Sequence, residues 1–296
     1  MQFKDMINKG KNISATIAVC KSNDEGVIKA VVKAVKNTNA NFILFDEQPQ
    51  DELIRSFNLT HDEFNRIKII QTEDEAHTIS ECVKSVDDGQ ADLIMKGLVA
   101  TSTLLKEVLK DKYNLKTESR MSHIALFNVP EYHKMLAISD VAMNISPNKE
   151  QKIVITRNLV ACLQKIGIDS PKVAILSAIE SVNPKMQSSV DANEVVSYFR
   201  KEMPKLEIEG PLAFDAAINK RASIIKNIDS NISGNVDGVV VPQIESGNIL
   251  YKSLIYLSKA DVASVIFGAK IPIILTSRSD SSRDKFHSIC SALMLI

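Results

Sequence analysis

The sequence lacks the features that mark several large classes of protein. It has no tryptophan, and its basic residues are not interleaved with aromatic ones, so the stacking surfaces of nucleic-acid binders have no support. Lys plus Arg equals Asp plus Glu, at 36 each, so no net field draws nucleic acid or an acidic membrane toward the protein. We therefore expect neither partner, and any anionic ligand has to be held by a local site.

Signals for metal, redox and membrane functions are missing as well. The five histidines show no HxxxH or similar spacing, so we expect no metal site. The four cysteines are far apart in apolar contexts, which predicts buried free thiols and fits a reducing compartment. No apolar run approaches the ~18 residues of a membrane span, and the N-terminus lacks the apolar segment of a secretory signal. The expectation is a soluble, cytoplasmic protein.

Short apolar runs rich in β-branched residues recur along the chain. Runs of this length without alternation are typical of strands covered on both faces, as in a parallel sheet. Stretches with helical periodicity lie between many of them, which predicts βαβ units and an α/β fold. The runs are Ala15–Cys20, Asn41–Phe45, Arg66–Ile70, Asp92–Met95, His123–Val129, Lys172–Leu176, Asp237–Val241 and Ile271–Thr276. The clearest helical stretches are Val27–Val35, Ala76–Val86, Thr103–Leu109, Ile153–Ile166 and Ile249–Leu257.

The chain length of 296 residues favours one large domain or two medium ones. No linker rich in Gly, Ser or Pro divides the sequence, and the best boundary is the turn-like cluster Asn144–Lys149. Two smaller sheets with a cleft between them fit the length better than one wide sheet. Composition leaves both arrangements open.

Polar residues follow several of the predicted strands, where ligands bind in open α/β sheets. Gly97 allows a close backbone approach, and Thr101 lies where a helix begins. The N–H groups at the start of that helix favour an anion. The simpler interpretation is that Thr101 or Ser102 only caps the helix. The loop from Ser177 to Lys185 is a weak signal, typical of an exposed connection. Further along the chain, Asn248 and Lys252 share one helical face, and a capped helix with a solvated lysine explains them equally well.

The fourth such place, after the run that ends at Thr276, carries the strongest signal. Ser277 and Arg278 follow the run directly, and Arg binds phosphate bidentately while keeping its charge. Asp280 or Asp284 could act as a general base if its proton affinity were raised. The alternative is a helix cap, since Ser281 three residues before Asp284 is similar to a capping box. An arginine directly after a buried strand favours function.

Four motifs in the C-terminal half, in this order, resemble those of the phosphate acetyltransferase and phosphate butyryltransferase family. Gly210–Ala217 (GPLAFDAA) is similar to the family's G-P-L-x-x-D-A-A, and Gly234–Asp237 (GNVD) to its G-x-A-D. Glu245–Lys252 (ESGNILYK) matches G-N-x-x-Y-K, and Ser277-Arg278 matches the family's S-R. The N-terminal half fits less sharply, through Gly97 and Thr101.

The resemblance implies a fold like that of the isocitrate and isopropylmalate dehydrogenases. In that fold two α/β/α domains flank a cleft that holds the active site, and the last segment of the chain returns to the first domain. On this sequence the first domain would be 1–142 with 271–296, and the second domain 143–270. A homodimer or larger homo-oligomer is a further expectation from the family.

The implied reaction converts a short-chain acyl-CoA and phosphate into acyl phosphate and CoA, or the reverse, by direct transfer in a ternary complex. Coenzyme A is a substrate, and no permanently bound cofactor is implied. The resemblance assigns Ser277 and Arg278 to the oxyanion and the phosphate, and Asp284 to the base, with Asp280 in reserve. The substrate-binding candidates are Gly97, Thr101, Lys106, Ser177, Lys185, Asn248 and Lys252.

Details of the motifs favour a butyryl or branched short acyl group over acetyl. Ser279-Asp280 stands where the acetyl branch has Gly-Cys, and the run ending at Thr276 reads like the butyryl branch. Lys106 stands where the family often has an arginine, and a lysine makes no bidentate contact. The alternatives are a phosphate acetyltransferase, a metal- and NAD-dependent decarboxylating dehydrogenase, which needs a cluster of aspartates, and a two-domain binding protein without turnover.

Overall fold

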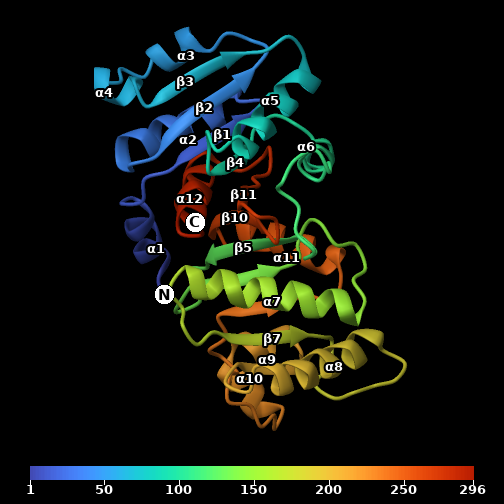
Figure 1. Cartoon of the computed structure of the whole chain (residues 1–296). Helices are drawn as coiled ribbons and strands as arrows, with labels where there is room; N and C mark the ends of the chain where they lie inside the picture. The colour runs from blue at the N-terminus through green and yellow to red at the C-terminus, as the bar shows by residue number, and fades with distance from the viewer. The chain divides into compact units, whose positions relative to one another are not determined.

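The computed structural model describes residues 1–296, and helices alternate with strands along most of the chain (Figure 1). The strands are β1 (Thr16–Cys20), β2 (Asn41–Asp46), β3 (Ile67–Gln71), β4 (Leu93–Lys96), β5 (Ser122–Asn128), β6 (Leu136–Ser139), β7 (Lys172–Leu176), β8 (Glu207–Leu212), β9 (Gly238–Val240), β10 (Asp261–Phe267) and β11 (Ile273–Ile274). The helices are α1 (Phe3–Gly10), α2 (Glu25–Asn37), α3 (Asp51–Arg55), α4 (His61–Phe64), α5 (Glu75–Asp87), α6 (Thr101–Val108), α7 (Lys149–Lys165), α8 (Gln187–Glu202), α9 (Phe214–Ile218), α10 (Lys220–Ile225), α11 (Ile244–Tyr256) and α12 (Ser282–Leu293). The mixed α/β fold predicted from the sequence is confirmed.

The chain divides into two compact units. The terminal unit holds 4–118 and 263–296, so both ends of the chain contribute to it, and the central unit holds 1–3 and 119–262. The domains expected from the sequence have later boundaries, after residues 142 and 270. As domain limits they stay a prediction.

In the terminal unit the strand order is β3-β2-β1-β4-β11-β10. All neighbours run parallel except β10 and β11. Helix α5 packs on β1 and β2, while α2 packs on α12. The chain leaves β1 toward β2, whereas β4 lies on the other side of β1. Such a reversal creates a topological switch point at the carboxyl ends of β1 and β4, where open α/β sheets bind ligands.

In the central unit the strand order is β5-β6-β9-β7-β8. Strand β5 is antiparallel to β6, and the remaining pairs are parallel. Helices α7 and α8 pack on each other and on this sheet (Figure 1). A buried apolar cluster ties the sheet to α11 and fixes the helix on it. Its members include Phe127, Leu136, Val239, Tyr251 and Leu254.

The expected strands agree with the structure in most places, with two kinds of correction. The run Ile271–Thr276 forms only the two-residue β11, and strands β6, β8 and β10 were not predicted. Strand β8 (EIEGPL) was missed because it is an edge strand, partly exposed and containing Pro211, which sheets tolerate mainly at edges. The sheets are also not purely parallel, since β5–β6 and β10–β11 are antiparallel.

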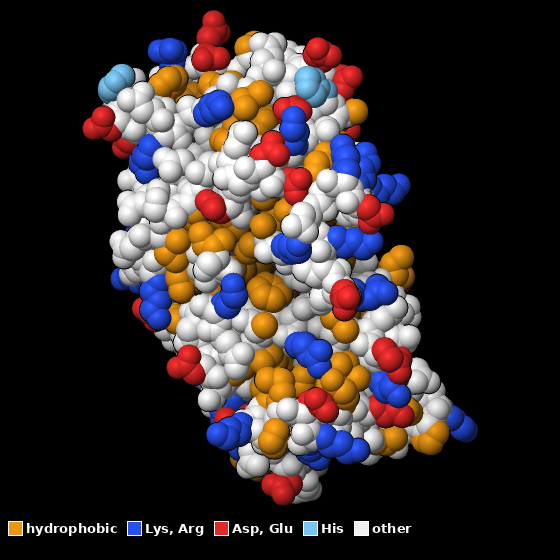
Figure 2. All heavy atoms as spheres, viewed as in Figure 1, with side chains coloured by type: hydrophobic (Ala, Val, Ile, Leu, Met, Phe, Trp, Pro, Cys, Tyr) orange, Lys and Arg blue, Asp and Glu red, His pale blue; other side chains and the backbone are white.

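Two general expectations can be compared with the structure. All four cysteines are buried and free, as predicted. No helix combines the length and the apolar character needed to cross a membrane. Lys and Arg side chains are interspersed with Asp and Glu on the face shown in Figure 2, so an anion site has to come from a local concentration of cations.

Candidate active site

At the switch point of the terminal unit, the loop after β4 lies directly against the loop after β1. The Gly97 N–H donates to the Cys20 carbonyl over 2.8 Å, and the Leu98 N–H donates to the Lys21 carbonyl over 2.8 Å. A Cβ atom on Gly97 would lie 2.0 Å from the Lys21 oxygen, a distance that no side chain tolerates. Glycine is therefore required for the close approach that the sequence predicted at this position.

Helix α6 begins without a side-chain cap. Its N-cap is Ala100, with no side-chain hydrogen bond to the first turn, so the interpretation of Thr101 or Ser102 as the cap is wrong. The first-turn N–H groups of a helix need partners from outside the helix and favour an anion. Thr101 is half-buried in this first turn, whereas Lys106 is exposed in the last turn of the same helix.

The loop after β11 is a tight turn closed by two side chains. The Asp280 carboxylate accepts the Ser277 N–H over 2.7 Å, and the Lys285 ammonium donates to the carbonyls of Asp280 (2.6 Å) and Ser277 (3.3 Å). The Ser277 hydroxyl lies 3.0 Å from that of Ser279. Between these anchors the Arg278 side chain is exposed and makes no hydrogen bond or ion pair.

Asp284 lies in the first turn of α12. Its N–H donates to the Ser281 hydroxyl over 3.1 Å, and that hydroxyl donates to the Asp284 carboxylate over 2.5 Å. The interpretation of Ser281 as a helix cap is therefore confirmed. His287 Nδ1 lies 4.0 Å from the second carboxylate oxygen of Asp284.

Sequence reasoning missed a buried lysine beside this loop. Lys96 ends β4 and is only 4% exposed; its ammonium donates to the carbonyls of Gly97 (3.0 Å) and Val99 (3.2 Å). Burial, followed by the charges of Arg278 and Lys285, lowers the pKa of Lys96, and Asp280 opposes the shift. The available signal was a lysine at the end of an apolar strand, in the sequence Met95-Lys96-Gly97.

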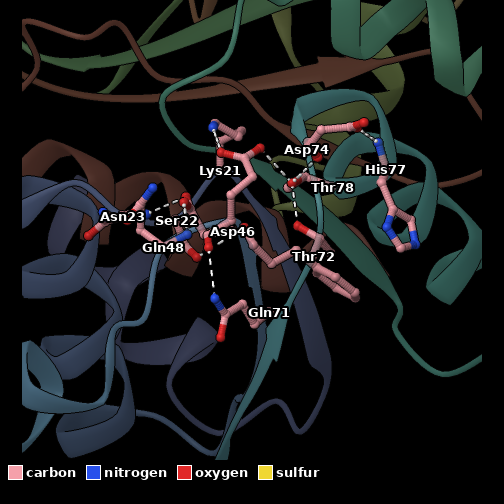
Figure 3. A network of polar contacts seen from close by, with 12 residues as sticks. Lys21, Ser22, Asn23, Asp46, Gln48, Gln71, Thr72, Asp74, His77 and Thr78 are labelled. Carbon is pink, nitrogen blue, oxygen red and sulfur yellow. Dashed lines mark hydrogen bonds and ion pairs between the residues drawn. The ribbon is translucent and has the colours of Figure 1, made fainter.

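Lys21, a second lysine at the carboxyl edge of the terminal unit, is paired with a nearby carboxylate. It forms an ion pair with Glu47, whose other oxygen accepts the Thr78 hydroxyl over 2.8 Å. Burial is the largest single influence and opposes both charges, but the hydrogen bonds and the nearby opposite charges together outweigh it, so the pKa of Lys21 is raised and that of Glu47 is lowered. Figure 3 shows this polar network, which joins the ends of β1, β2 and β3 to the start of α5; its labelled members are Lys21, Ser22, Asn23, Asp46, Gln48, Gln71, Thr72, Asp74, His77 and Thr78.

The remaining predicted residues lie at the carboxyl edge of the central unit. Ser177 directly follows β7, is buried, and lies 2.9 Å from the Ser188 hydroxyl. Asn248 lies on α11 after β9 and donates to the Val141 carbonyl over 3.4 Å. Lys185 and Lys252 are exposed. Because β7 and β9 are neighbouring parallel strands, their following loops meet at the same edge of this sheet.

A buried carboxylate organises the same edge. Asp140, 2% exposed, accepts N–H groups from Ala142 and Met143 at 2.9 Å each and from His123 at 3.2 Å. A Cβ on Gly247 would lie 2.5 Å from the Asp140 carbonyl oxygen. A carboxylate whose lone pairs are satisfied by backbone N–H groups holds a loop in place, so we assign Asp140 to structure.

The predicted site residues thus form two groups, one in each unit; most lie at a carboxyl edge, whereas Lys106 lies in the last turn of α6. The terminal unit contributes Gly97, Thr101, Lys106, Ser277, Arg278, Asp280 and Asp284, and the central unit contributes Ser177, Lys185, Asn248 and Lys252.

A comparison with known proteins identifies the family to which this fold and these loops belong. Residues 76–293 match the family described as phosphate acetyl/butaryl transferase. The chain belongs to this family. The resemblance seen in the motifs is confirmed, and with it phosphate acyl transfer as the class of reaction.

Relatives of this phosphate acyltransferase cover the whole chain. A probable phosphate butyryltransferase of Bacillus subtilis is 40% identical over 296 residues, 99% of this chain and 97% of that protein. A phosphate acetyltransferase of Thermotoga maritima is 35% identical over 292 residues, 98% of each. The crystal structure of a branched-chain phosphotransacylase from Enterococcus faecalis has a TM-score of 0.85 at 38% identity, covering 95% of this chain and 98% of that one.

Proposed function

We propose that the protein interconverts a butyryl or branched short-chain acyl-CoA plus phosphate with acyl phosphate plus CoA. The observation that carries this proposal is the Arg278 guanidinium, exposed and free of ion pairs on a loop that Asp280 and Lys285 hold closed. A guanidinium of this kind can bind phosphate bidentately without first breaking an internal ion pair. The buried ammonium group of Lys96 is close enough to Arg278 for their charges to interact.

The proposed chemistry is direct transfer. In the direction of acyl-CoA synthesis, the CoA thiol loses its proton to a carboxylate, and the thiolate attacks the acyl carbonyl carbon. The carbon–sulfur bond forms, the bond from this carbon to the phosphate oxygen breaks, and phosphate leaves. Arg278 and the Ser277 hydroxyl stabilise the charge that develops on the carbonyl oxygen and the departing phosphate.

Asp284 is the better choice for the base. The Asp280 carboxylate already accepts the Ser277 N–H and closes the turn, so protonating it would weaken the loop that presents Arg278. Asp284 accepts a hydrogen bond from the Ser281 hydroxyl, which can rotate away. A carboxylate within hydrogen-bond reach of the thiol is the geometric requirement for this role.

The other predicted residues have binding roles in this proposal. The uncapped start of α6, with Gly97 and Thr101, supplies N–H donors to phosphate oxygens, and Lys106 supplies a point charge. The candidates from the central unit bind CoA; these are Ser177, Lys185, Asn248 and Lys252.

Further expectations rest on the family resemblance and are part of the proposal. They include a dehydrogenase-like arrangement of two α/β/α domains with a cleft, divided as 1–142 with 271–296 and 143–270. They also include a cytoplasmic location, a homodimer or larger homo-oligomer, and no permanently bound cofactor.

A thiol-release assay tests the proposal. Butyryl-CoA, isobutyryl-CoA and acetyl-CoA are each supplied with phosphate, and free CoA is followed. We expect phosphate-dependent release, fastest with a four-carbon acyl group, because each methylene buried in an apolar pocket contributes about 0.8 kcal/mol. Faster turnover of acetyl-CoA would favour the acetyltransferase alternative. No release with any of the three would overturn the function, and reduction of NAD with a hydroxy acid would replace it with the dehydrogenase.

A further inference from the structure

The terminal unit buries two lysines that have no carboxylate partner. Lys96 is 4% exposed and Lys285 is 3% exposed. The hydrogen bonds of both ammonium groups go to backbone carbonyls alone. Burying a positive charge is costly unless an opposite charge offsets it. In the ligand-free protein, burial of these two ammonium groups is therefore unfavourable in free energy.

The third buried lysine of the chain is paired with a carboxylate, the usual arrangement for a buried charge. Lys152 in the central unit is 5% exposed, and its ammonium lies 2.6 Å from the Asp191 carboxylate. The partly exposed Lys134 and Lys21 also have carboxylate partners, Asp237 and Glu47. These three lysines are each paired with a carboxylate, whereas Lys96 and Lys285 are not.

The two exceptions, Lys96 and Lys285, lie near the loop that carries Arg278. Strand β11 runs parallel to β4 with Ile274 opposite Met95, so the end of β11 lies beside Lys96. Lys285 bonds the turn that follows β11. The charges of both Arg278 and Lys285 act on Lys96. Among the charges that act on Lys96, Arg278 and Lys285 are cations and Asp280 is a carboxylate, which accepts the Ser277 N–H.

We propose that Lys96, Arg278 and Lys285 form one anion subsite for a phosphate dianion, in which Lys96 contacts the anion and Lys285 positions the loop. An ammonium group has three N–H donors, and carbonyls take two from Lys96, which leaves one for a phosphate oxygen. A dianion would offset the excess of positive charge. This inference rests on the proposed function only in taking the reaction's phosphoryl group as the anion.

Binding of inorganic phosphate tests the contact by Lys96 without turnover. At constant ionic strength, added phosphate should raise the midpoint of thermal unfolding of the wild-type protein. The Lys96→Met variant should need about 10- to 100-fold more phosphate for the same rise, because it loses one charge-assisted hydrogen bond. Lys84→Met, which removes an exposed lysine from the last turn of α5, is the matched control and should respond like wild type. An unchanged phosphate response in Lys96→Met would overturn the contact.

Kinetics separate contact from positioning. Lys96→Met should raise KM for phosphate about tenfold or more and leave KM for butyryl-CoA unchanged. Lys285→Gln should lower kcat, because the turn that presents Ser277 and Arg278 loses its anchor, and Lys285→Arg should restore part of the rate. Equal kcat in wild type and Lys285→Gln would overturn the positioning role.

Failure of this inference and failure of the proposed function give different results. A wild-type protein that is stabilised by phosphate yet releases no thiol would retain the subsite and lose the acyltransferase function. A wild-type protein that turns over butyryl-CoA while Lys96→Met keeps its phosphate KM would retain the function and lose the subsite. Absence of both phosphate stabilisation and turnover would remove both.

Discussion

The carboxyl edges of the two units use charge in opposite ways. In the central unit the buried charges are balanced: Lys152 pairs with Asp191, and backbone N–H groups satisfy Asp140. In the terminal unit Lys96 has only carbonyl partners and Arg278 has none. Internal pairing stabilises a loop, whereas unpaired cations leave capacity for an anion. The difference supports our proposal that phosphate binds in the terminal unit, and it gives the buried charges of the central unit a structural role.

The largest effect is expected from breaking the balanced pair. Lys152→Met should lower the free energy of unfolding by about 3–5 kcal/mol, because it leaves the Asp191 carboxylate buried without its cation. In Lys96→Met the change should stay below about 1 kcal/mol, because removing a buried charge that has no carboxylate partner offsets the loss of its two hydrogen bonds to the Gly97 and Val99 carbonyls. Urea unfolding of both variants measures the contrast. Adding Asp191→Leu to Lys152→Met should recover most of the loss, and similar losses in the two single variants would contradict the comparison.

Removal of the free guanidinium should affect rate and not stability. Arg278→Gln should lower kcat by about 100- to 1000-fold, the usual effect of losing one transition-state donor, while unfolding stays as in wild type. Thiol release from butyryl-CoA with phosphate provides the measurement. Arg221→Gln, at an exposed position on α10, is the control and should keep full activity. Turnover close to wild type in Arg278→Gln would remove that residue from the site.

Both edges depend on a glycine at a close backbone approach, and this similarity can be tested. Gly97→Ala and Gly247→Ala would place Cβ atoms 2.0 Å and 2.5 Å from carbonyl oxygens of neighbouring loops. Each should lower the free energy of unfolding by about 1–3 kcal/mol. Gly26→Ala in helix α2 is the control, since its Cβ would meet only side-chain atoms, the nearest at 3.1 Å, and alanine favours a helix. A neutral Gly97→Ala would show that the two loops separate readily.

The smallest effect concerns the paired lysine of the terminal unit. Burial raises the pKa of Glu47, but hydrogen bonds from Lys21 and Thr78 and the charge of Lys21 together outweigh burial and hold the pKa below its usual 4.5. A lowered pKa adds stability above the usual value, and this stability is lost as pH falls through the folded-state pKa. Glu47→Gln should therefore lower the free energy of unfolding by about 1 kcal/mol at neutral pH. At low pH the difference in unfolding free energy between this variant and wild type should become smaller. Urea unfolding at both pH values gives the answer, and Glu73→Gln, exposed and unpaired in any salt bridge, should show no such narrowing.

Local sequence was sufficient for elements whose pattern agrees with their surroundings. Buried parallel strands such as β1, β2 and β7 appear as unbroken apolar runs because helices cover both of their faces. Strand β8 was missed because an edge strand does not need continuous apolar residues, and Thr101 was mistaken for a cap because cap preference is only statistical. Ser277 and Arg278 could be proposed from the sequence because an arginine directly after a buried strand favours function, and their role stays a prediction.

By itself the sequence determined the α/β class and the family, because apolar periodicity and ordered motifs are properties of the chain; for the site it gave the prediction of Ser277-Arg278. Only the tertiary structure decided which charges are balanced. Lys96, Lys152 and Lys285 cannot be told apart in the sequence. Whether each has a carboxylate partner depends on which groups the fold places within hydrogen-bond reach. Arg278 stands out for the same reason, because Asp280 bonds the Ser277 N–H and leaves the guanidinium free. Partner choice over long sequence separations is set by packing, which no local pattern contains.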